Sequence, residues 1–327
     1  MPAKVLITVD TELSAGNQLR GMSARANFES SVLGRCAAGD FGICWQMERL
    51  EAMGLCATYF VDPMPALVHG GQIIADIVGP ILERGHEVQM HIHTEWLQWA
   101  KTSPVNGRLG RNIGDFSYND QLTLLTIARD LLEAAGAPRP IAFRAGNYGA
   151  NEDSLKALAA LGIAWDASVN PAYLGDTCQI LADPAQGGAA MMHAVALLPV
   201  AGLNDVPGHF RPAQICAISA AEMRAALCHA AATCHPAFVI VTHSFEMLTR
   251  DRARPNRTVT ARFEAMCRTI SRHTGLISTG FSALDAAALC AHPTNPARLG
   301  PNYLRTARRV AEQALATWRY ERRLLPA

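Results

Sequence analysis

Short apolar stretches alternate along the chain with longer segments in which apolar and polar residues repeat as in amphipathic helices. The short stretches are rich in β-branched residues, which is typical of strands covered on both faces. Predicted strands cover residues 4–12, 56–61, 85–96, 141–146, 163–168, 195–200, 238–243 and 276–279. Predicted helices cover residues 45–53, 73–84, 120–135, 151–161, 219–234, 258–273, 282–289 and 298–323. This alternation predicts an α/β protein with a mostly parallel sheet.

Five of the predicted strands end on side chains that can take part in catalysis. In chain order these are Asp10 with Glu12, His91 with His93, Arg144, Asp166 and His243. The carboxyl ends of parallel strands lie on one side of a sheet or barrel, so these groups are expected to meet there. One such coincidence means little, whereas five in series indicate a single catalytic face.

Two histidines at the end of one strand suggest a metal site. His91 and His93 are two residues apart and therefore share a face of the strand. Imidazole nitrogens are good ligands for divalent transition metals. Asp10 and Glu12 have the same spacing, although a solvated turn or a helix N-cap would also explain them. A pair of surface histidines near a turn is the alternative for His91 and His93, but the two pairs together favour a metal site of two histidines and a carboxylate.

Two long segments without a clear period are expected to lie over this face. Residues 13–44 contain several glycines and are predicted to form a lid loop. Residues 96–119 are predicted to form a second one, in which Trp99, Arg108 and Arg111 could grip a sugar or an anion. A plain surface loop is the alternative for that second segment.

Two further segments contain residues that could bind a substrate, a membrane or a partner. His209 and Arg211, in a predicted loop at residues 208–212, are candidate substrate-binding residues, with a plain loop as the alternative. The predicted terminal helix at residues 298–323 holds seven arginines and two glutamates. It is expected to be solvated or docked on the domain, and binding to an anionic membrane or a partner is the alternative.

Composition excludes several classes of protein. A formal net charge of +1 over 327 residues argues against a nucleic-acid binder that works by bulk electrostatics. The nine cysteines are scattered and form no Cys-x-x-Cys pair, which argues against zinc-knuckle and thioredoxin-type motifs. The chain shows no apolar run of membrane-spanning length and no secretory pattern at its first residues, so a cytoplasmic location is expected.

The ordered set of motifs resembles that of the NodB-type polysaccharide deacetylases, carbohydrate esterase family 4. The five matching segments are residues 8–12, 85–93, 143–146, 165–168 and 241–243, and the resemblance covers roughly residues 4–285. It implies a distorted (β/α) barrel of about seven parallel strands. It also implies a catalytic domain at residues 1–291, with lid loops at 13–44 and 96–119, followed by a basic helical extension at residues 292–327.

The sequence departs from the family pattern at two points. Most members have adjacent aspartates in the first motif, whereas Asp10 and Glu12 are separated by Thr11. The second motif usually has histidines four apart, but here the position four after His91 is Glu95. His93 is therefore the predicted third ligand, and Glu95 is held in reserve.

The resemblance implies a metal-dependent hydrolase of linear amide bonds. Glu12, His91 and His93 would bind one divalent metal, with zinc expected and cobalt, nickel or iron as alternatives. Water activated by the metal would attack the amide, with Asp10 as the general base and His243 as the general acid.

Two more motif residues would support this pair. Arg144 would hold Asp10 in place and keep it ionised, and Asp166 would orient His243 and keep it charged. Simple structural roles are the alternatives: Arg144 would then only bridge strand ends, and Asp166 would only cap a turn.

The expected substrate is an N-acetylated sugar, such as a nucleotide- or lipid-linked glycan precursor. Hydrolysis of another C–N bond, of the formamide or ureide type, is an alternative on the same fold. A catalytically silent relative that binds a glycan or a partner protein is another. The sequence leaves the oligomeric state open, and a homo-oligomer is compatible with it.

Overall fold

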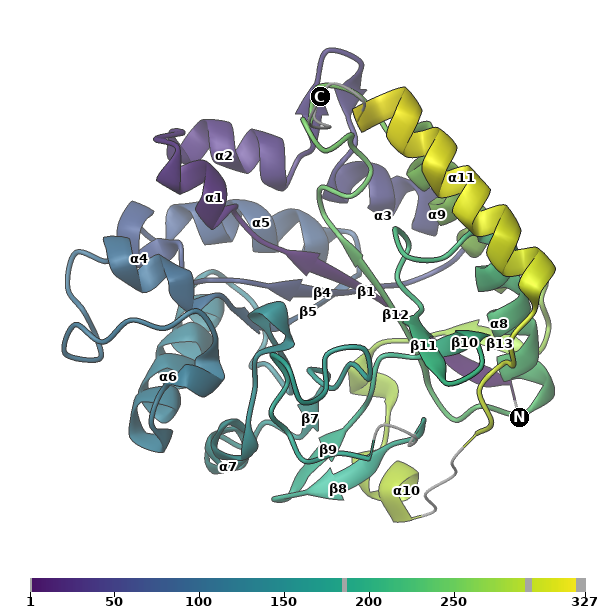
Figure 1. Ribbon diagram of the computed structural model, residues 1–327. Coiled ribbons are helices and arrows are strands. Elements are labelled where there is room, and N and C mark those ends of the chain that lie inside the picture. Colours follow the sequence, from purple (N-terminus) through teal and green to yellow (C-terminus); the bar gives the residue numbers. More distant parts are fainter. Residues whose placement is uncertain (1, 184–186, 292–295, 322–327) are drawn as a thin grey trace.

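The computed structural model describes residues 2–183, 187–291 and 296–321. In this part of the chain, the main sheet has nine strands and is surrounded by helices (Figure 1). In spatial order the strands are β12 (Phe238–His243), β1 (Ala3–Thr11), β4 (Thr58–Val61), β5 (Glu87–Ile92), β6 (Ala142–Ala145), β7 (Trp165–Asp166), β9 (Val195–Leu197) and β8 (Ala190–Met192). The ninth, β13 (Leu276–Ser278), pairs with the start of β1 on the edge opposite β12, because Val5 pairs with both Phe238 and Ser278.

The seven strands from β12 to β9 are parallel to their neighbours, and β8 is antiparallel to β9. Beyond β9 the chain turns back toward β12, where Val200 forms a bridge with Val239. The amide of Ala201 then donates a hydrogen bond to the carbonyl of Val239 at 3.1 Å. The two sides of the sheet therefore meet, which confirms the predicted distorted (β/α) barrel of about seven parallel strands.

Helices cover the sheet and connect its strands. The described helices are α1 (Ala15–Leu19), α2 (Ala24–Ser31), α3 (Ile43–Glu51), α4 (Ala66–His69), α5 (Gln72–Glu83), α6 (Tyr118–Ala134), α7 (Glu152–Ala160), α8 (Ala220–Ala232), α9 (Arg257–Arg272), α10 (Ala286–Ala291) and α11 (Tyr303–Glu321). Four 3-10 turns lie at Thr94–Trp99, Ile113–Asp115, Gly146–Tyr148 and Phe281–Ala283. Two hairpins, β2 (Arg35–Cys36) with β3 (Gly39–Asp40) and β10 (Gly202–Val206) with β11 (His209–Pro212), lie outside the main sheet.

Local sequence explains where the main elements begin. Strand β1 is central, and its apolar side chains, such as Leu6 and Ile7, are buried on both faces. The Ser219 hydroxyl accepts a hydrogen bond from the amide of Glu222, and the Glu222 carboxylate accepts one from the amide of Ser219. This is the capping box expected for α8. Asn151 caps α7 as predicted.

The segment at residues 13–44 is more ordered than its pattern predicts. It contains α1, α2 and the β2–β3 hairpin, so the expectation that it forms a loop without helices or strands is wrong. Both helices are short, and several of their buried residues are polar: Asn17, Asn27 and Ser31 bond to one another. The sequences of such helices show no helical repeat of apolar residues. Whether this segment acts as a lid stays a prediction.

The terminal helix α11 runs along the outside of α8 and α9 (Figure 1). It begins at Tyr303, and the predicted residues 322 and 323 lie outside the described part of the chain. Among the described helices, none combines the length and the hydropathy needed to cross a membrane.

Candidate active site

The predicted catalytic residues meet at the carboxyl ends of the barrel strands. Asp10 of β1 pairs in register with His243 of β12, and His91 of β5 pairs with Arg144 of β6. The side chains of Asp10, His91 and His243 line a cavity of about 310 Å³. The structure therefore brings motifs far apart in the chain to one side of the sheet.

Three side chains in this cavity form a candidate metal centre. The Oε2 atom of Glu12 lies 2.6 Å from Nε2 of His93 and 3.2 Å from Nε2 of His91. The three ligand atoms lie within 4.8 Å of one another. Glu12 Oε2 is buried and has no hydrogen-bond partner in the described structure. A buried carboxylate oxygen without a hydrogen bond is costly, and a cation at this point would satisfy it.

The second nitrogen of each imidazole is held by an acceptor. Nδ1 of His91 donates to the carbonyl oxygen of Arg144 at 2.7 Å. Nδ1 of His93 donates to Oε2 of Glu95 at 2.8 Å. With a proton on Nδ1, Nε2 is the nitrogen of each ring that a cation beside Glu12 would take, as in the histidines of known metal sites. Glu95 therefore orients His93 and does not belong to the ligand group.

Charge at the centre also favours a cation. Burial alone would raise the pKa of Glu12, but His93 and His91 hold that pKa well below its usual value. Burial opposes a charge on His93, yet the carboxylates of Glu12 and Glu95 raise the pKa of His93 well above the usual value. Positive charge between these groups is therefore stabilised, whether a proton or a metal ion carries it.

Asp10 is fixed on the other side of the cavity. Its Oδ1 accepts a hydrogen bond of 2.6 Å from Nη1 of Arg144, whose side chain is fully buried. The same Nη1 donates to the hydroxyl of Thr8 at 2.9 Å, and the guanidinium lies over the ring of Phe60. Oδ2 of Asp10 lies 3.8 Å from Nε2 of His243. One carboxylate oxygen is thus tied to Arg144, and the other faces the histidine.

The carboxylate that orients His243 is Glu246, which corrects the prediction for Asp166. Nδ1 of His243 donates to Oε1 of Glu246 at 2.8 Å. Burial lowers the pKa of His243, but Glu246 contributes most to raising it to about 9. Glu246 in turn accepts hydrogen bonds from Thr242 and Gln214. His243 is therefore an imidazolium at neutral pH.

Asp166 has a different setting. Its carboxylate accepts hydrogen bonds from the amide of Ser168 at 2.9 Å and from the hydroxyl of Ser168 at 2.7 Å. Burial raises the pKa of Asp166 to about 6, although Ser168 and Arg144 act in the opposite direction. These contacts fix the turn after β7, which is the structural alternative considered for this residue.

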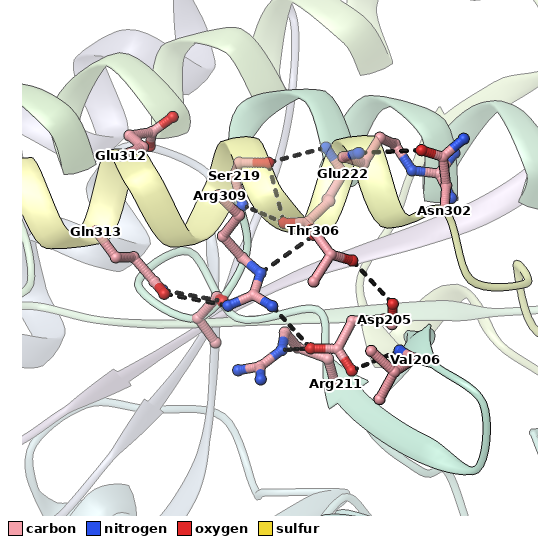
Figure 2. A network of polar contacts seen from close by, with 12 residues as sticks. Asp205, Val206, Arg211, Ser219, Glu222, Asn302, Thr306, Arg309, Glu312 and Gln313 are labelled. Atoms are coloured by element: carbon pink, nitrogen blue, oxygen red, sulfur yellow. Dashed lines mark hydrogen bonds and ion pairs between the residues drawn. The ribbon is translucent and has the colours of Figure 1, made fainter.

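His209 and Arg211 lie in β11 and bond to Asp205 of β10, at 2.6 and 2.5 Å (Figure 2 shows the second contact). They are not among the residues that line the cavity. The prediction that they contact substrate is therefore corrected. The strand is only four residues long, follows a Pro-Gly pair and ends on a proline, so its pattern resembles that of a loop.

Other residues that line the cavity were not singled out by their pattern. The rings of Tyr148 and Tyr173 stack with centroids 5.2 Å apart and planes 23° apart. Thr177 also lines the cavity, and its hydroxyl donates to the carbonyl of Asn147 at 2.8 Å. Arg111, expected to be in a substrate-gripping loop, lies at the cavity with a largely exposed side chain. Tyr148 lies four residues after Arg144 and two after the end of the arginine motif, and this closeness is the signal in the sequence that could have marked it.

No family model matches the chain, and no curated protein sequence matches it either. Several solved structures are similar in fold. A protein of Mycobacterium smegmatis assigned as a polysaccharide deacetylase has a TM-score of 0.58 and 16% identity over 91% of this chain and 93% of its own. The allantoinase PuuE has a TM-score of 0.50 and 13% identity over 85% of this chain and 88% of its own.

A 4-α-glucanotransferase of Thermococcus litoralis also has a TM-score of 0.50, with 10% identity over 86% of this chain and 40% of its own. Identities this low show the fold alone. The resemblance to NodB-type deacetylases is confirmed at that level. The three neighbours carry names of different activities, so the fold by itself does not select the substrate.

Proposed function

We propose that the protein is a metal-dependent N-deacetylase that removes an acetyl group from an N-acetylated sugar or glycan precursor. The proposal rests mainly on one observation: the group of Glu12, His91 and His93 shares a cavity with Asp10 and His243. A cation site, a fixed carboxylate and a positively charged imidazole are what amide hydrolysis requires within one cavity.

Glu12, His91 and His93 would hold the divalent cation. Two imidazole nitrogens and one carboxylate oxygen suit zinc, and cobalt, nickel and iron also accept this set. When bound, the ion polarises the amide carbonyl and lowers the pKa of a water molecule. Glu95 and the carbonyl of Arg144 keep the two imidazoles in the ligand tautomer.

Asp10 is the general base in this proposal. Arg144 holds Oδ1 and stabilises the ionised carboxylate, so Oδ2 accepts the proton of the attacking water. Oδ2 is also the oxygen that lies 3.8 Å from Nε2 of His243, so base and acid would act from neighbouring positions on the same bound amide.

His243 is the general acid. Its pKa of about 9 keeps Nε2 protonated at neutral pH. As the C–N bond of the tetrahedral adduct breaks, Nε2–H protonates the leaving nitrogen, and the products are acetate and a free amine. Glu246 keeps the imidazole oriented and stabilises its charge throughout.

A sugar substrate fits the wall of the cavity. The stacked rings of Tyr148 and Tyr173 offer an apolar face, and Arg111 adds a cation. Carbohydrate rings pack on aromatic faces through their C–H groups, and a guanidinium binds hydroxyl or phosphate oxygens. The fold similarity to a protein assigned as a polysaccharide deacetylase supports the same class of substrate.

A ureide or formamide substrate is the second candidate, because the allantoinase PuuE has a similar fold. The same base and acid would serve for that C–N bond.

A panel assay separates the candidates: zinc- or cobalt-loaded protein is incubated with N-acetylated sugars, sugar nucleotides, allantoin and formamides. Acetate release from a sugar supports the deacetylase. Turnover of a ureide or formamide alone would replace it with the second candidate, and no turnover of any amide would contradict both.

A further inference from the structure

Helix α11 contacts the rest of the molecule through polar side chains (Figure 2). Arg309 is buried, and its Nη2 donates to Oδ2 of Asp205 at 2.7 Å while its Nε donates to Oε1 of Glu222 at 3.1 Å. The hydroxyl of Thr306 donates to the carbonyl of Asp205 at 2.8 Å. The two Arg309 contacts are charge-assisted and buried, and with the Thr306 contact they define one orientation of the helix.

A second set of contacts lies on the same side, about one turn further along. Glu312 accepts a hydrogen bond of 2.7 Å from Nε of Arg262 in α9. Gln313 accepts one of 3.1 Å from Nη1 of Arg309. The inward side of α11 is thus polar over several turns, and Tyr320 is its buried aromatic residue.

The outward side of the same helix is apolar. Five large apolar side chains on α11 are between 52% and 69% exposed: Tyr303, Leu304, Val310, Leu315 and Trp318. The three alanines at positions 307, 311 and 314 are exposed between them. At 3.6 residues per turn these positions form one continuous band, which we call the α11 stripe. An amphipathic helix on a soluble domain normally buries this side, so the orientation of α11 is inverted.

The charges beside the stripe are positive. Arg308 and Arg319 are exposed and lie along one edge of it, by helical spacing. The one acidic residue between Tyr303 and Tyr320 is Glu312, which bonds inward to Arg262. An apolar band with an aromatic residue at each end and arginines along its edge has the composition of a helix that lies in a membrane interface.

We propose that the α11 stripe binds the surface of an anionic lipid bilayer. The apolar side chains enter the boundary between headgroups and acyl chains, and Arg308 and Arg319 contact lipid phosphates. The polar network of Arg309 holds the helix on the barrel in the orientation that exposes the stripe. Binding therefore requires no refolding, and this proposal is independent of the proposed catalytic function.

A second copy of the chain fits the stripe less well. From Tyr303 to Trp318 the stripe is about 22 Å long at 1.5 Å per residue, and with a width of about 10 Å it covers roughly 220 Å². A stable dimer buries about 800 Å² on each partner. The stripe is thus too small to hold two copies together, whereas insertion of a few side chains suffices for reversible binding to a bilayer.

Vesicle co-sedimentation tests the proposal with the full chain. The probes are vesicles of pure phosphatidylcholine and vesicles with about 25% phosphatidylserine. Wild-type protein should bind the anionic vesicles at least about tenfold more tightly than the neutral ones, and added salt should weaken the binding. The double variant L304E/L315E should lose about tenfold or more of that affinity, since glutamate neither inserts nor tolerates an anionic surface.

The matched control is the double variant L19E/L181E, which adds the same two charges at exposed leucines outside α11. This variant should bind the vesicles as the wild type does, and thermal unfolding shows that all variants are folded. Equal binding to neutral and anionic vesicles, or unchanged binding of L304E/L315E, would overturn the proposal. So would a wild-type dimer in sedimentation velocity that disappears in L304E/L315E, because a second copy would then occupy the stripe.

Discussion

At the scale of single residues, the site depends on which carboxylate faces each histidine. Glu95 faces Nδ1 of His93, and Glu246 faces Nδ1 of His243. The first pairing leaves Nε2 as a free ligand atom, and the second keeps a proton on Nε2 of His243. In the proposed mechanism the two histidines of one cavity thus have different roles: His93 lies against Glu12 of the candidate metal centre, and His243 lies near Asp10.

Glu246→Gln should lower the pKa of His243, because it removes the negative charge that contributes most to raising that pKa to about 9. His243 acts in its protonated form, so activity is lost as pH rises through its pKa. The alkaline limb of the kcat/KM profile should therefore move to lower pH by about one unit or more in the variant. Asp166→Asn is the matched control and should leave that limb in place. The reverse outcome, a shift in Asp166→Asn and none in Glu246→Gln, would return the orienting role to Asp166.

Asp10→Asn removes the base but keeps the shape of the side chain. Because Asp10 is outside the ligand group, the variant should keep its metal content, and kcat should fall by about 10²–10⁴-fold. Metal analysis and initial rates on the same sample measure both. A variant that turns over at the wild-type rate would show that another group takes the proton.

At the scale of elements, polar contacts decide the position of α11. Arg309 lies between Asp205 and Glu222, and all three side chains are at most 4% exposed. A buried charge cluster of this kind adds little net stability when complete, but it is costly to break. The cluster therefore sets the orientation of α11 and the face that points outward, and it contributes little to the net stability of the domain.

Arg309→Met should destabilise the protein by about 3–5 kcal/mol, because Glu222 would keep a buried charge without its arginine and Asp205 would lose one of its two arginines. Urea unfolding measures the change. Arg308→Met, at the neighbouring exposed position, is the control and should change the free energy of unfolding by less than about 0.5 kcal/mol. Equal effects of the two substitutions would mean that the cluster does not hold the helix.

At the scale of the whole molecule, the sequence predicts best what depends on local pattern. The buried strands, the order of the motifs and the capping box of α8 follow from residues close together in the chain, and they are confirmed. The catalytic residues could be placed at one face because the carboxyl ends of parallel strands must lie together.

The errors come from contacts between distant residues. Arg309 and Asp205 are 104 residues apart, so the local sequence does not show that Asp205 belongs to a buried cluster with α11. Asp205 is only four residues from His209 and six from Arg211, and these local contacts could have been noticed. Glu246 is only three residues after His243 and could have been noticed, but the motif pattern pointed to Asp166. The short helices at residues 13–44 pack through asparagine and serine, which hydrophobic periodicity does not detect.

The central claim is that Glu12, His91 and His93 bind a divalent metal, and metal content tests it most directly. Elemental analysis of the purified, dialysed protein should give about one equivalent of metal per chain, directly or after loading with zinc or cobalt. His91→Ala should lose it, while His193→Ala, which alters a surface ion pair with Glu152, should retain it. A wild-type protein that holds no metal even after loading, or a His91→Ala variant that holds a full equivalent, would contradict the account.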